Sequence, residues 1–495
     1  MNSMNSKSRC FFAKTSLFGL SGFILLTLVS CQNKNESMDK SQEKVRIITL
    51  DPGHFHAALL QKSMYDEIDT LVHVYAPEGS EVENHMKLVE SYNTRSENPT
   101  FWKTEVYKGP DYLEKMFSER AGNVVIISGN NKSKSKYITM VIDSGMNVLA
   151  DKPLAIDNDG FKSLEKAFQT AKKNKLLLYD IMTERYNIYY ILQRELSQDS
   201  DFFGTLEKGT LENPSVIKQS VHHFYKNVSG KPLVRPVWFF DVEQEGHGLV
   251  DITTHMVDLI QWECFPDVKL DYKKDVKMLA AKEWATVISP AQFLKSTTKA
   301  EFPDYLKKYV KNNQLEVLSN GEMNYTLKDV HARVSIQWNF EASEGSGDTQ
   351  YSQMRGTKAS LIIKQGKEQG YKPVVYIDPL KSSEKSVQDA IGRIQGKYAG
   401  VSIKKSGNLW EIVIPEKLKV GHEDHFAEVA KKYLEYLKTA QLPAWEVPNM
   451  LAKYYTTTQA LEMARKKLDV MFQQIINLHN TSFNDRFRTF RTRIT

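Results

Sequence analysis

The sequence contains very little cysteine. Three cysteines occur in 495 residues, and two of them, Cys10 and Cys31, lie in an N-terminal segment with the features of a leader. If that leader is removed and Cys31 is modified, only Cys264 remains. A disulfide framework or a cysteine-based metal site within one mature chain is therefore excluded.

The sequence also lacks a hydrophobic run of transmembrane length. The apolar run from Leu17 to Val29 is shorter than the roughly 20 residues that a helix needs to span a bilayer. It follows a basic stretch and leads into Leu28-Val29-Ser30-Cys31, which looks like a bacterial lipobox. We expect residues 1–30 to be a signal peptide and Cys31 to carry lipid, followed by a flexible tether over 31–43. The mature protein would then be lipid-anchored in the bacterial cell envelope, on the periplasmic side or at the cell surface.

An excess of charge of one sign is also absent. The chain has 66 Lys and Arg against 60 Asp and Glu, a formal net charge of +6, with 41% hydrophobic and 25% charged residues. These values are ordinary for a globular chain of two or three domains. Charges of both signs are mixed along the sequence, which argues against a nucleic-acid-binding protein.

Strand and helix patterns alternate in the first part of the chain. Apolar segments predict strands at 44–50, 70–76, 124–128 and 147–150, and helical patterns lie between them, at 57–65 and 135–144. Such alternation is typical of a parallel sheet. We therefore expect an α/β fold class, with a doubly wound parallel sheet over residues 44–158.

Longer, two-sided strand patterns follow at 217–225, 332–341, 360–364 and 409–414. This pattern is typical of antiparallel sheets. We expect an α+β domain with a largely antiparallel open sheet over residues 159–445, and C-terminal helices over 446–495. Helical patterns at 423–438 and 448–477 predict final helices that pack back on the body. The segments 274–325 and 365–406 show no pattern from which a role follows.

Two short segments carry the groups needed to move the proton of a hydroxyl. Lys152 follows a predicted strand and so lies at its carboxyl end, where open α/β sheets bind ligands. Asp251 and His255 share one face if this segment is helical, because residues i and i+4 are neighbours on a helix. The simpler alternatives are a solvent-exposed loop lysine, an aspartate that caps its helix, and a buried structural histidine.

These segments resemble the Gfo/Idh/MocA family of sugar and cyclitol oxidoreductases. The matching motifs are Val148-Leu-Ala-Asp-Lys-Pro-Leu-Ala155, Thr183-Glu-Arg-Tyr186 and Gly246-His-Gly-Leu-Val-Asp-Ile-Thr-Thr-His-Met-Val-Asp258. The resemblance implies a Rossmann domain followed by a substrate domain, and NAD(P)-dependent chemistry on a sugar hydroxyl. It also implies that Lys152 hydrogen-bonds the reacting hydroxyl, that His255 is the general base or acid, and that Asp251 orients the histidine.

The expected cofactor loop departs from the family's pattern. A Gly-x-Gly-x-x-Gly fingerprint lets the backbone approach the pyrophosphate of a dinucleotide. Here the corresponding stretch is Asp51-Pro52-Gly53-His54-Phe55-His56, which keeps one glycine, adds a carboxylate and loses a backbone donor. The resemblance places further cofactor contacts at Glu78, Ser128, Asn130, Asn131, Asp151 and Lys152. We expect NAD or NADP, with NAD favoured, and tight binding, because an envelope protein has no soluble nicotinamide pool to draw on.

Planar donors and aromatic side chains of the kind that hold sugar rings are the substrate-binding candidates. They are Arg185, His222, His223, Tyr225, Arg235, Trp238 and His247. Each has an alternative role at the surface or in the core. His54 and His56 with a third histidine such as His247 are candidates for metal ligands, but their spacing matches no metal motif, so no metal is predicted.

The sequence thus leads to the hypothesis of a lipid-anchored NAD(P)-dependent oxidoreductase that acts on a sugar or glycoside hydroxyl. Two alternatives stay open: a redox-neutral NAD-dependent glycosidase or lyase, and a cofactor-free carbohydrate-binding lipoprotein. The expected partners are a carbohydrate or glycan and, through Cys31, the membrane. Members of the family pair through the open sheet face, so a homo-oligomer and a monomer are both compatible with the sequence.

Overall fold

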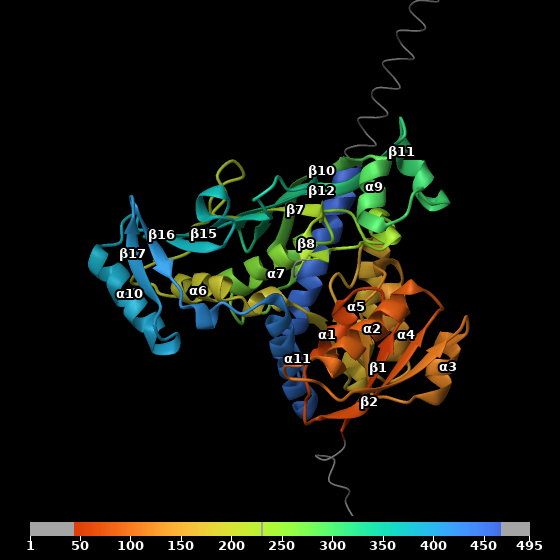
Figure 1. Ribbon diagram of the computed structural model, residues 1–495. Coiled ribbons are helices and arrows are strands. Elements are labelled where there is room, and N and C mark those ends of the chain that lie inside the picture. The colour runs from red at the N-terminus through yellow and green to blue at the C-terminus, as the bar shows by residue number, and fades with distance from the viewer. Residues whose placement is uncertain (1–43, 229–230, 467–495) are drawn as a thin grey trace, which may run out of the picture. The chain divides into compact units, whose positions relative to one another are not determined.

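A computed structural model describes residues 44–228 and 231–466 of the chain (Figure 1). The predicted signal peptide, the Cys31 lipidation site and the tether lie outside these residues, as does the end of the predicted C-terminal helical segment. Within the two described ranges, no helix is long and apolar enough to cross a membrane.

The N-terminal part forms a six-stranded parallel sheet in the order β3-β2-β1-β4-β5-β6. Its strands are β1 (Val45–Leu50), β2 (Ile68–Ala76), β3 (Lys103–Lys108), β4 (Val124–Ile127), β5 (Asn147–Asp151) and β6 (Leu178–Ile181). The strand order reverses between β1 and β4, and doubly wound sheets bind ligands at the carboxyl ends of such a switch point. The predicted parallel sheet is confirmed. It extends past residue 158, the expected boundary, because β6 pairs with β5.

Helices pack on both faces of this sheet. They include α2 (Ser80–Thr94), α3 (Tyr112–Glu119), α4 (Asn131–Asp143) and α5 (Asn158–Asn174). The helix after β1 is much shorter than the predicted 57–65, because α1 (His56–Leu59) is a single turn that continues as a 3-10 turn over Leu60–Lys62.

A helix from the far end of the chain covers the sheet beside α1. This helix is α11 (His422–Thr439), and its buried apolar residues recur at the spacing of one helix face: Phe426, Val429, Ala430, Tyr433 and Leu434. They share a core with residues of β1, β4 and β5. The predicted packing of a C-terminal helix on the body is thus observed, and it brings the start of α11 to the end of β1.

The C-terminal part forms a ten-stranded, largely antiparallel sheet in the order β10-β12-β13-β7-β14-β15-β16-β18-β17, with β11 beside β12. The strands are β7 (Val216–Tyr225), β10 (Val276–Ile288), β11 (Val310–Lys311), β12 (Gln314–Leu327), β13 (Val330–Glu341), β14 (Thr349–Arg355), β15 (Ser360–Gln365), β16 (Val374–Asp378), β17 (Ser402–Ser406) and β18 (Leu409–Val413). Only the β7–β13 pair among these is parallel. The predicted sheet is confirmed, and the two segments without an assigned role extend its edges through β10, β12, β16 and β17.

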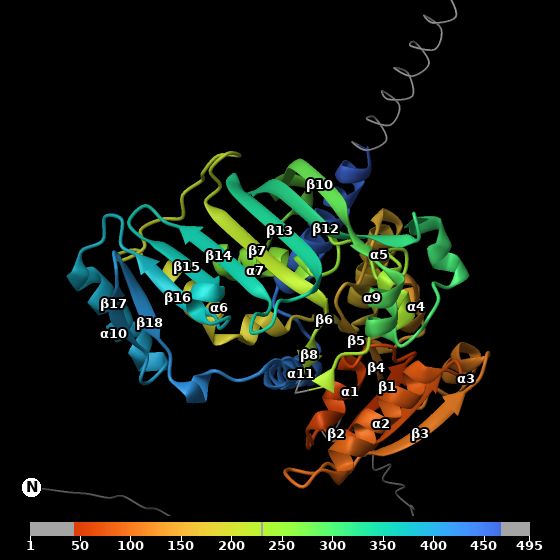
Figure 2. The same ribbon diagram turned by 45° about the horizontal axis from the view of Figure 1, so that its top comes forward.

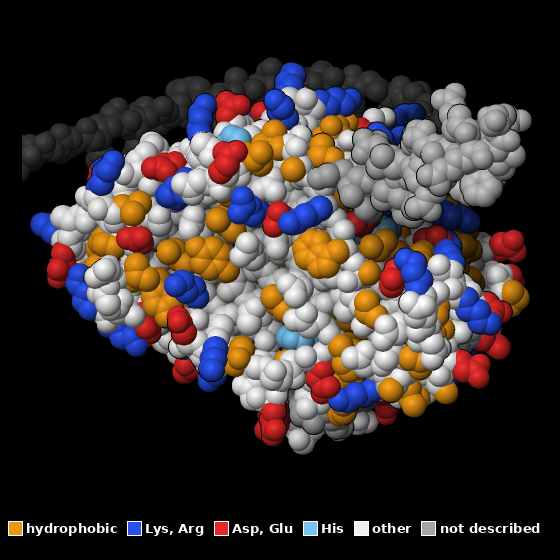
Figure 3. Space-filling model, turned by 90° about the horizontal axis from the view of Figure 1, so that it is seen from above, with side chains coloured by type: hydrophobic (Ala, Val, Ile, Leu, Met, Phe, Trp, Pro, Cys, Tyr) orange, Lys and Arg blue, Asp and Glu red, His pale blue; other side chains and the backbone are white. Residues whose placement is uncertain are grey.

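Helices cover one face of this second sheet and leave the other open (Figure 2). The covering helices are α6 (Ile188–Ser197) and α7 (Thr253–Cys264), and α10 (Glu384–Lys397) lies next to α6 and β17. The face of the molecule seen in Figure 3 carries Lys, Arg, Asp and Glu side chains interspersed with apolar ones. This surface agrees with the mixed charge pattern of the sequence.

Candidate functional site

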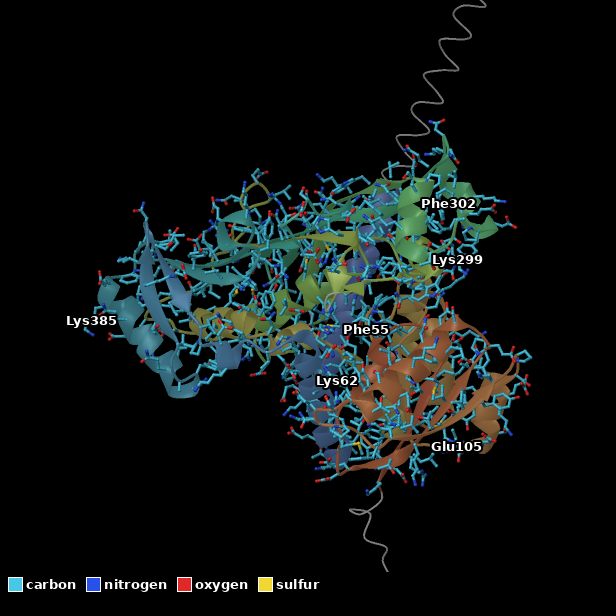
Figure 4. The ribbon with its side chains drawn as sticks, in the orientation of Figure 1. Phe55, Lys62, Glu105, Lys299, Phe302 and Lys385 are labelled. Carbon is cyan, nitrogen blue, oxygen red and sulfur yellow. The ribbon has the colours of Figure 1, made fainter. Side chains whose placement is uncertain are left out.

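The carboxyl ends of β1, β4 and β5 lie next to the segment that leads into α7 and to the first turn of α11. Phe55, labelled in Figure 4, follows β1, and its ring centroid lies 6.2 Å from that of His422 in α11. Lys62, also labelled, forms an ion pair with Glu423 in the same turn of α11. Side chains from distant parts of the sequence therefore meet at this edge of the parallel sheet.

Lys152 and Asp251 form a buried ion pair between the two halves of the molecule. Lys152 follows β5, and its Nζ lies 2.5 Å from Oδ1 of Asp251, with side-chain exposures of 11% and 7%. Asp251 precedes α7 without capping it, because no side-chain hydrogen bond closes that helix end. The alternatives of a solvent-exposed lysine and a helix-capping aspartate are therefore not what the structure shows.

His255 lies in the first turn of α7, close to this pair. Its Nδ1 is buried and has no hydrogen-bond partner among the described residues. Burial first, and then the charges of Lys152 and His422, hold the pKa of His255 well below its ordinary value. Burial works to lower the pKa of Lys152, but Asp251, Asp151 and Glu245 together outweigh it and the pKa is raised. At neutral pH the site thus combines a neutral imidazole with a charged ammonium group.

Glu245 is a buried carboxyl group of this site that sequence reasoning missed. Burial and the neighbouring Asp251 raise its pKa well above the ordinary value. It lines a small cavity together with Asp251, and its backbone oxygen accepts a hydrogen bond from the Asn131 amide. The signal that points to Glu245 is its position directly before Gly246, at the start of the glycine-rich motif.

The loop after β1 is held down on the end of β4. The N–H groups of Gly53 and His54 both donate to the backbone oxygen of Ser128, at 3.1 and 3.2 Å. A Cβ atom on Gly129 would lie 2.3 Å from the backbone oxygen of Asp51, so the two loops touch through their backbones. The Asp51 carboxylate accepts a hydrogen bond from Tyr137 at 2.8 Å. Two of the backbone donors that a phosphate loop would present are therefore already used within the protein.

Two histidines of this loop converge on Asp151 at the end of β5, and we call His54, His56 and Asp151 the histidine cluster. Nδ1 of His54 lies 2.9 Å from Oδ2 of Asp151, and Nδ1 of His56 lies 3.0 Å from Oδ1. Despite these distances, both imidazole nitrogens and Asp151 Oδ1 lack an aligned hydrogen bond within the described part of the chain. The ring of His422 stacks on that of His56 with centroids 4.9 Å apart.

Burial shapes the protonation of the histidine cluster. It lowers the pKa of His56 to about 4, even though Asp151 works in the opposite direction. Burial also works to raise the pKa of Asp151, but His56 and His54 hold that pKa well below its ordinary value. The cluster therefore presents an ionised carboxylate and neutral imidazoles, which is the protonation state in which these groups bind metal ions.

The remaining cofactor candidates surround this edge of the sheet. Asn130 donates to Gln244 at 2.7 Å, and the Ser128 hydroxyl donates to Asp151 at 3.2 Å. Glu78 is exposed in the turn after β2. Sequence reasoning missed Lys134, which is buried and donates to Asn131 and to the backbone oxygen of Asp151. Burial lowers its pKa to about 8.

Arg185, a substrate-binding candidate, is committed to other residues. Its guanidinium group binds Asp258 through two hydrogen bonds of 2.7 Å and Glu446 at 2.9 and 3.0 Å. Lys453 Nζ lies 2.8 Å from Asp258 and 2.7 Å from Asp180. We call these five residues the arginine network. Because Arg185 is bound within it, its role is to hold β6, α7 and the C-terminal helical residues together.

His247 is likewise engaged within the protein. Its Nδ1 lies 2.7 Å from Glu283 and its Nε2 lies 2.6 Å from an Arg465 nitrogen. His247 therefore does not lie with His54 and His56. Both of its ring nitrogens are engaged within the protein and neither is free to bind a substrate.

The other substrate candidates lie on the second domain. His222 and His223 approach Asp348 at 3.3 and 2.8 Å, and His223 and Tyr225 line a cleft of about 680 Å³. Arg235 is tied to backbone oxygens of residues 223 and 224, and burial lowers its pKa to about 10. Trp238 reaches the loop after β1, because a Cβ atom on residue 53 would lie 3.5 Å from its ring.

Comparison with known proteins finds a family model and solved structures that match this chain. The family model described as "Putative oxidoreductase C terminal domain" matches residues 192–465. A search of curated proteins finds no match. Among solved structures, a "putative oxidoreductase" from Parabacteroides merdae ATCC 43184 is 50% identical, with a TM-score of 0.84, and the alignment covers 86% of this chain and 98% of that chain.

Two solved structures of low identity share the fold. A levoglucosan dehydrogenase in complex with NADH is 11% identical, with a TM-score of 0.55, over 86% of this chain and 98% of that chain. KijD10, a 3-ketoreductase from Actinomadura kijaniata solved with NADP and TDP-benzene, is 13% identical, with a TM-score of 0.51, over 84% of this chain and 96% of that chain.

The family model covers more than half of the 495 residues, and the 50%-identical structure aligns over most of both chains. The TM-scores show that the fold is shared with these solved structures. The chain therefore belongs to the oxidoreductase family defined by this C-terminal domain, and its fold is of the Gfo/Idh/MocA type.

Proposed function

We propose that this chain is an NAD(P)-dependent oxidoreductase that oxidises or forms a hydroxyl group on a sugar or glycoside. The observation that carries the proposal is the meeting of Lys152, Asp251 and His255 at the carboxyl edge of the parallel sheet. Lysine and histidine there are the donor and the base that the chemistry of a hydroxyl requires.

The loops after β1 and β4 meet at the switch point of the parallel sheet, the edge at which doubly wound folds bind dinucleotides. Gly53 and Gly129 leave the two loops without side chains where they touch, and Glu78 is exposed after β2, where an acidic residue can reach ribose hydroxyls. The backbone contacts to the pyrophosphate are altered, because the N–H groups of Gly53 and His54 already donate to the backbone oxygen of Ser128. Glu78 is the exposed candidate for the rest of the cofactor, because Ser128 and Asn131 are buried and bind other residues of the protein.

The protein side of the reaction follows from charge and position. A bound nicotinamide would supply the acceptor or donor of hydride. In the oxidative direction, the Lys152 ammonium group donates a hydrogen bond to the substrate oxygen and stabilises the charge that develops there. The neutral imidazole of His255 takes the hydroxyl proton, and Asp251 fixes Lys152 in place through the 2.5 Å contact.

A carbohydrate substrate is supported by the second domain. His223 and Tyr225 line a cleft of about 680 Å³, and His222 lies 3.3 Å from Asp348, which also lines this cleft. Aromatic faces with a few polar groups are typical of small-molecule sites. The names of the levoglucosan dehydrogenase and the 3-ketoreductase that share the fold are consistent with sugar chemistry.

The first experiment asks whether the purified chain carries or binds nicotinamide and transfers hydride to or from glycosides. We expect His255→Gln to lower turnover by ~10²–10⁴-fold, the range of a lost acid or base group, while nicotinamide binding persists. Lys152→Arg keeps the pairing with Asp251 and tests the position of the donor without removing its charge. His425→Gln, a buried histidine of α11, is the matched control and should retain full turnover.

Two outcomes would contradict the proposal. If no nicotinamide is bound and none can be loaded at millimolar concentration, the chain is better described as a cofactor-free carbohydrate-binding protein. If hydride transfer occurs but His255→Gln and Lys152→Arg both leave it unchanged, the chemistry belongs to other residues.

We also propose that the mature protein is anchored through lipid on Cys31. Support comes from the sequence alone, in the short apolar run that ends at the Leu28-Val29-Ser30-Cys31 pattern. Mass spectrometry of the protein from bacterial membranes should show a diacylglyceryl group on Cys31, and Cys31→Ala should lack it. An unmodified N-terminus in the wild-type protein would refute the anchor.

A further inference from the structure

We infer that His54, His56 and Asp151 bind a divalent transition-metal ion. The loop after β1 contributes both histidines, and the end of β5 contributes the carboxylate. One ligand atom from each residue lies within 4.8 Å of the others. The inference rests on this geometry and stands apart from the proposed nicotinamide chemistry.

The distances within the histidine cluster suit a shared ion. Two ligand atoms that each lie about 2.1 Å from one metal, at octahedral or tetrahedral angles, are about 3.0–3.4 Å apart. Nδ1 of His54 and Nδ1 of His56 lie 2.9 and 3.0 Å from the Asp151 oxygens, close to the lower end of that range.

The polar atoms of the cluster lack other partners. His56 and Asp151 are 5% and 3% exposed, yet His56 Nδ1 and Asp151 Oδ1 have no aligned hydrogen bond within the described part of the chain. Buried polar atoms without partners are rare in native proteins, and an unseen ion is one of the explanations for them. Here the unpartnered atoms lie within hydrogen-bonding distance of one another without being aligned for a hydrogen bond, and ligands of one ion are placed in this way.

The nearby lysines interact with the charge of Asp151, but within the described ranges neither forms a direct ion pair with its carboxylate. Lys152 is paired with Asp251, and Lys134 donates to the Asn131 side chain and to the backbone oxygen of Asp151. The carboxylate is left facing the Ser128 hydroxyl and two imidazoles. A buried carboxylate requires a compensating positive charge, and a metal ion between the three ligands supplies it.

The donor set selects the class of metal. Two imidazoles and one carboxylate suit Zn²⁺, Fe²⁺, Co²⁺ or Ni²⁺, whereas Ca²⁺ and Mg²⁺ prefer sets made of oxygen alone. Three protein ligands leave coordination positions open, as in metal sites that bind a substrate or water. Because Asp151 adjoins Lys152, an oxygen ligand such as a hydroxyl or phosphate would bind beside the proposed proton-transfer residues.

The test is metal binding by the purified full chain without any nicotinamide. The chelator-treated protein is titrated with Co²⁺ and with Zn²⁺, desalted, and assayed for metal per chain by mass spectrometry. We expect one equivalent to remain bound and Co²⁺ to give visible absorption bands. His54→Gln and Asp151→Asn should each weaken binding by at least about 100-fold, since even partners outside the ligand shell contribute ~10–100-fold.

The control is His85→Gln, which removes a buried histidine from α2 in the same domain and should leave Co²⁺ binding unchanged. His54 is the safest ligand to replace, because its side chain is 36% exposed and its loss should not unfold the protein. The inference is overturned if wild-type protein retains no metal, or if the retained metal is equally abundant in His54→Gln, Asp151→Asn and the control. In that case the cluster is a histidine–carboxylate contact only.

Discussion

The histidine cluster and the arginine network are both buried and both carry charge, yet their side chains are partnered in opposite ways. In the network, Arg185 makes four hydrogen bonds of 2.7 to 3.0 Å with Asp258 and Glu446. In the cluster, imidazole nitrogens lie within 3.0 Å of Asp151 without aligned hydrogen bonds. Burial and charge alone therefore do not distinguish a structural site from a ligand site.

What distinguishes them is how completely the hydrogen-bonding groups are used. The planar guanidinium group of Arg185 matches two carboxylates at once, so little of its binding capacity remains for a substrate. The cluster keeps unpartnered polar atoms, and its ligand atoms lie within 4.8 Å of one another. A fold retains unpartnered buried polar atoms only at some expense in stability. The two sites should thus respond differently when the same change is made in each.

The largest effect is expected from Asp258→Asn in the arginine network. This change removes one negative charge and leaves the buried Arg185 and Lys453 without a shared partner. Breaking a buried ion pair by removing one partner costs about 3–5 kcal/mol. We expect the free energy of unfolding, measured in urea at pH 8, to fall by about that amount.

The control for this prediction is an exposed ion pair. Lys438 and Glu67 lie 2.8 Å apart with side-chain exposures of 61% and 37%, so Lys438→Met should change stability by about 1 kcal/mol or less. If Asp258→Asn proves as mild as Lys438→Met, the network does not hold the fold together, and Arg185 becomes a substrate-binding candidate again.

A smaller effect on the free energy of unfolding is expected from a change of pH. It acts through His85, a buried histidine that belongs neither to the cluster nor to the network. Both ring nitrogens of His85 in α2 lack hydrogen-bond partners among the described residues, and burial lowers the pKa of His85 from 6.5 to about 4. Below pH 6.5 the unfolded chain binds a proton that the folded chain rejects. The contribution of His85 to the free energy of unfolding is therefore fully present above pH 6.5. The free energy of unfolding falls by about 3 kcal/mol through His85 as the pH drops to 4.

The measurement is the free energy of unfolding from pH 8 to pH 4 in the wild type and in His85→Gln. The difference between the two curves isolates His85 from the carboxyl groups that also titrate in this range. Parallel curves would mean that His85 is not shielded from water as the structure shows.

The sequence predicted the fold better than it predicted the partners of buried side chains. Periodicity located both sheets, because local patterns of two and 3.6 residues report the burial of strand and helix faces. It did not predict that α1 stops after His56–Leu59 or that α11 covers the neighbouring sheet surface. That outcome depends on packing between segments that lie hundreds of residues apart.

The same limit applies to the site. The motif with Lys152 and the motif with Asp251 and His255 were found in the sequence, and the structure brings them together. Asp151 was not anticipated as a partner of His54 and His56, because the contact depends on how β1 and β5 align across β4. Arg185 was assigned to substrate since no local pattern ties an arginine to a carboxylate far away in the chain.

The smallest effect, and the sharpest contrast, is expected from Asp151→Asn. It is the same substitution as Asp258→Asn at a residue of similar burial, 3% against 2% exposed, and it is made in the metal-free protein at pH 8. Neutral imidazoles form no ion pair with Asp151 at that pH, and the amide oxygen of asparagine still accepts the hydrogen bond from Ser128. Because the folded state favours the ionised form of Asp151, stability should still fall, by about 1–2 kcal/mol and by less than in Asp258→Asn.

Adding Co²⁺ should increase the difference in stability between the wild type and Asp151→Asn. The ion should then stabilise the wild type and not Asp151→Asn, because a ligand that binds only the folded state shifts unfolding in proportion to its affinity. Thermal unfolding with and without Co²⁺ measures this difference, and Asp258→Asn should respond to the ion as the wild type does. A loss of several kcal/mol in metal-free Asp151→Asn would instead make the cluster a second structural network, and it would remove the reason to separate the two sites.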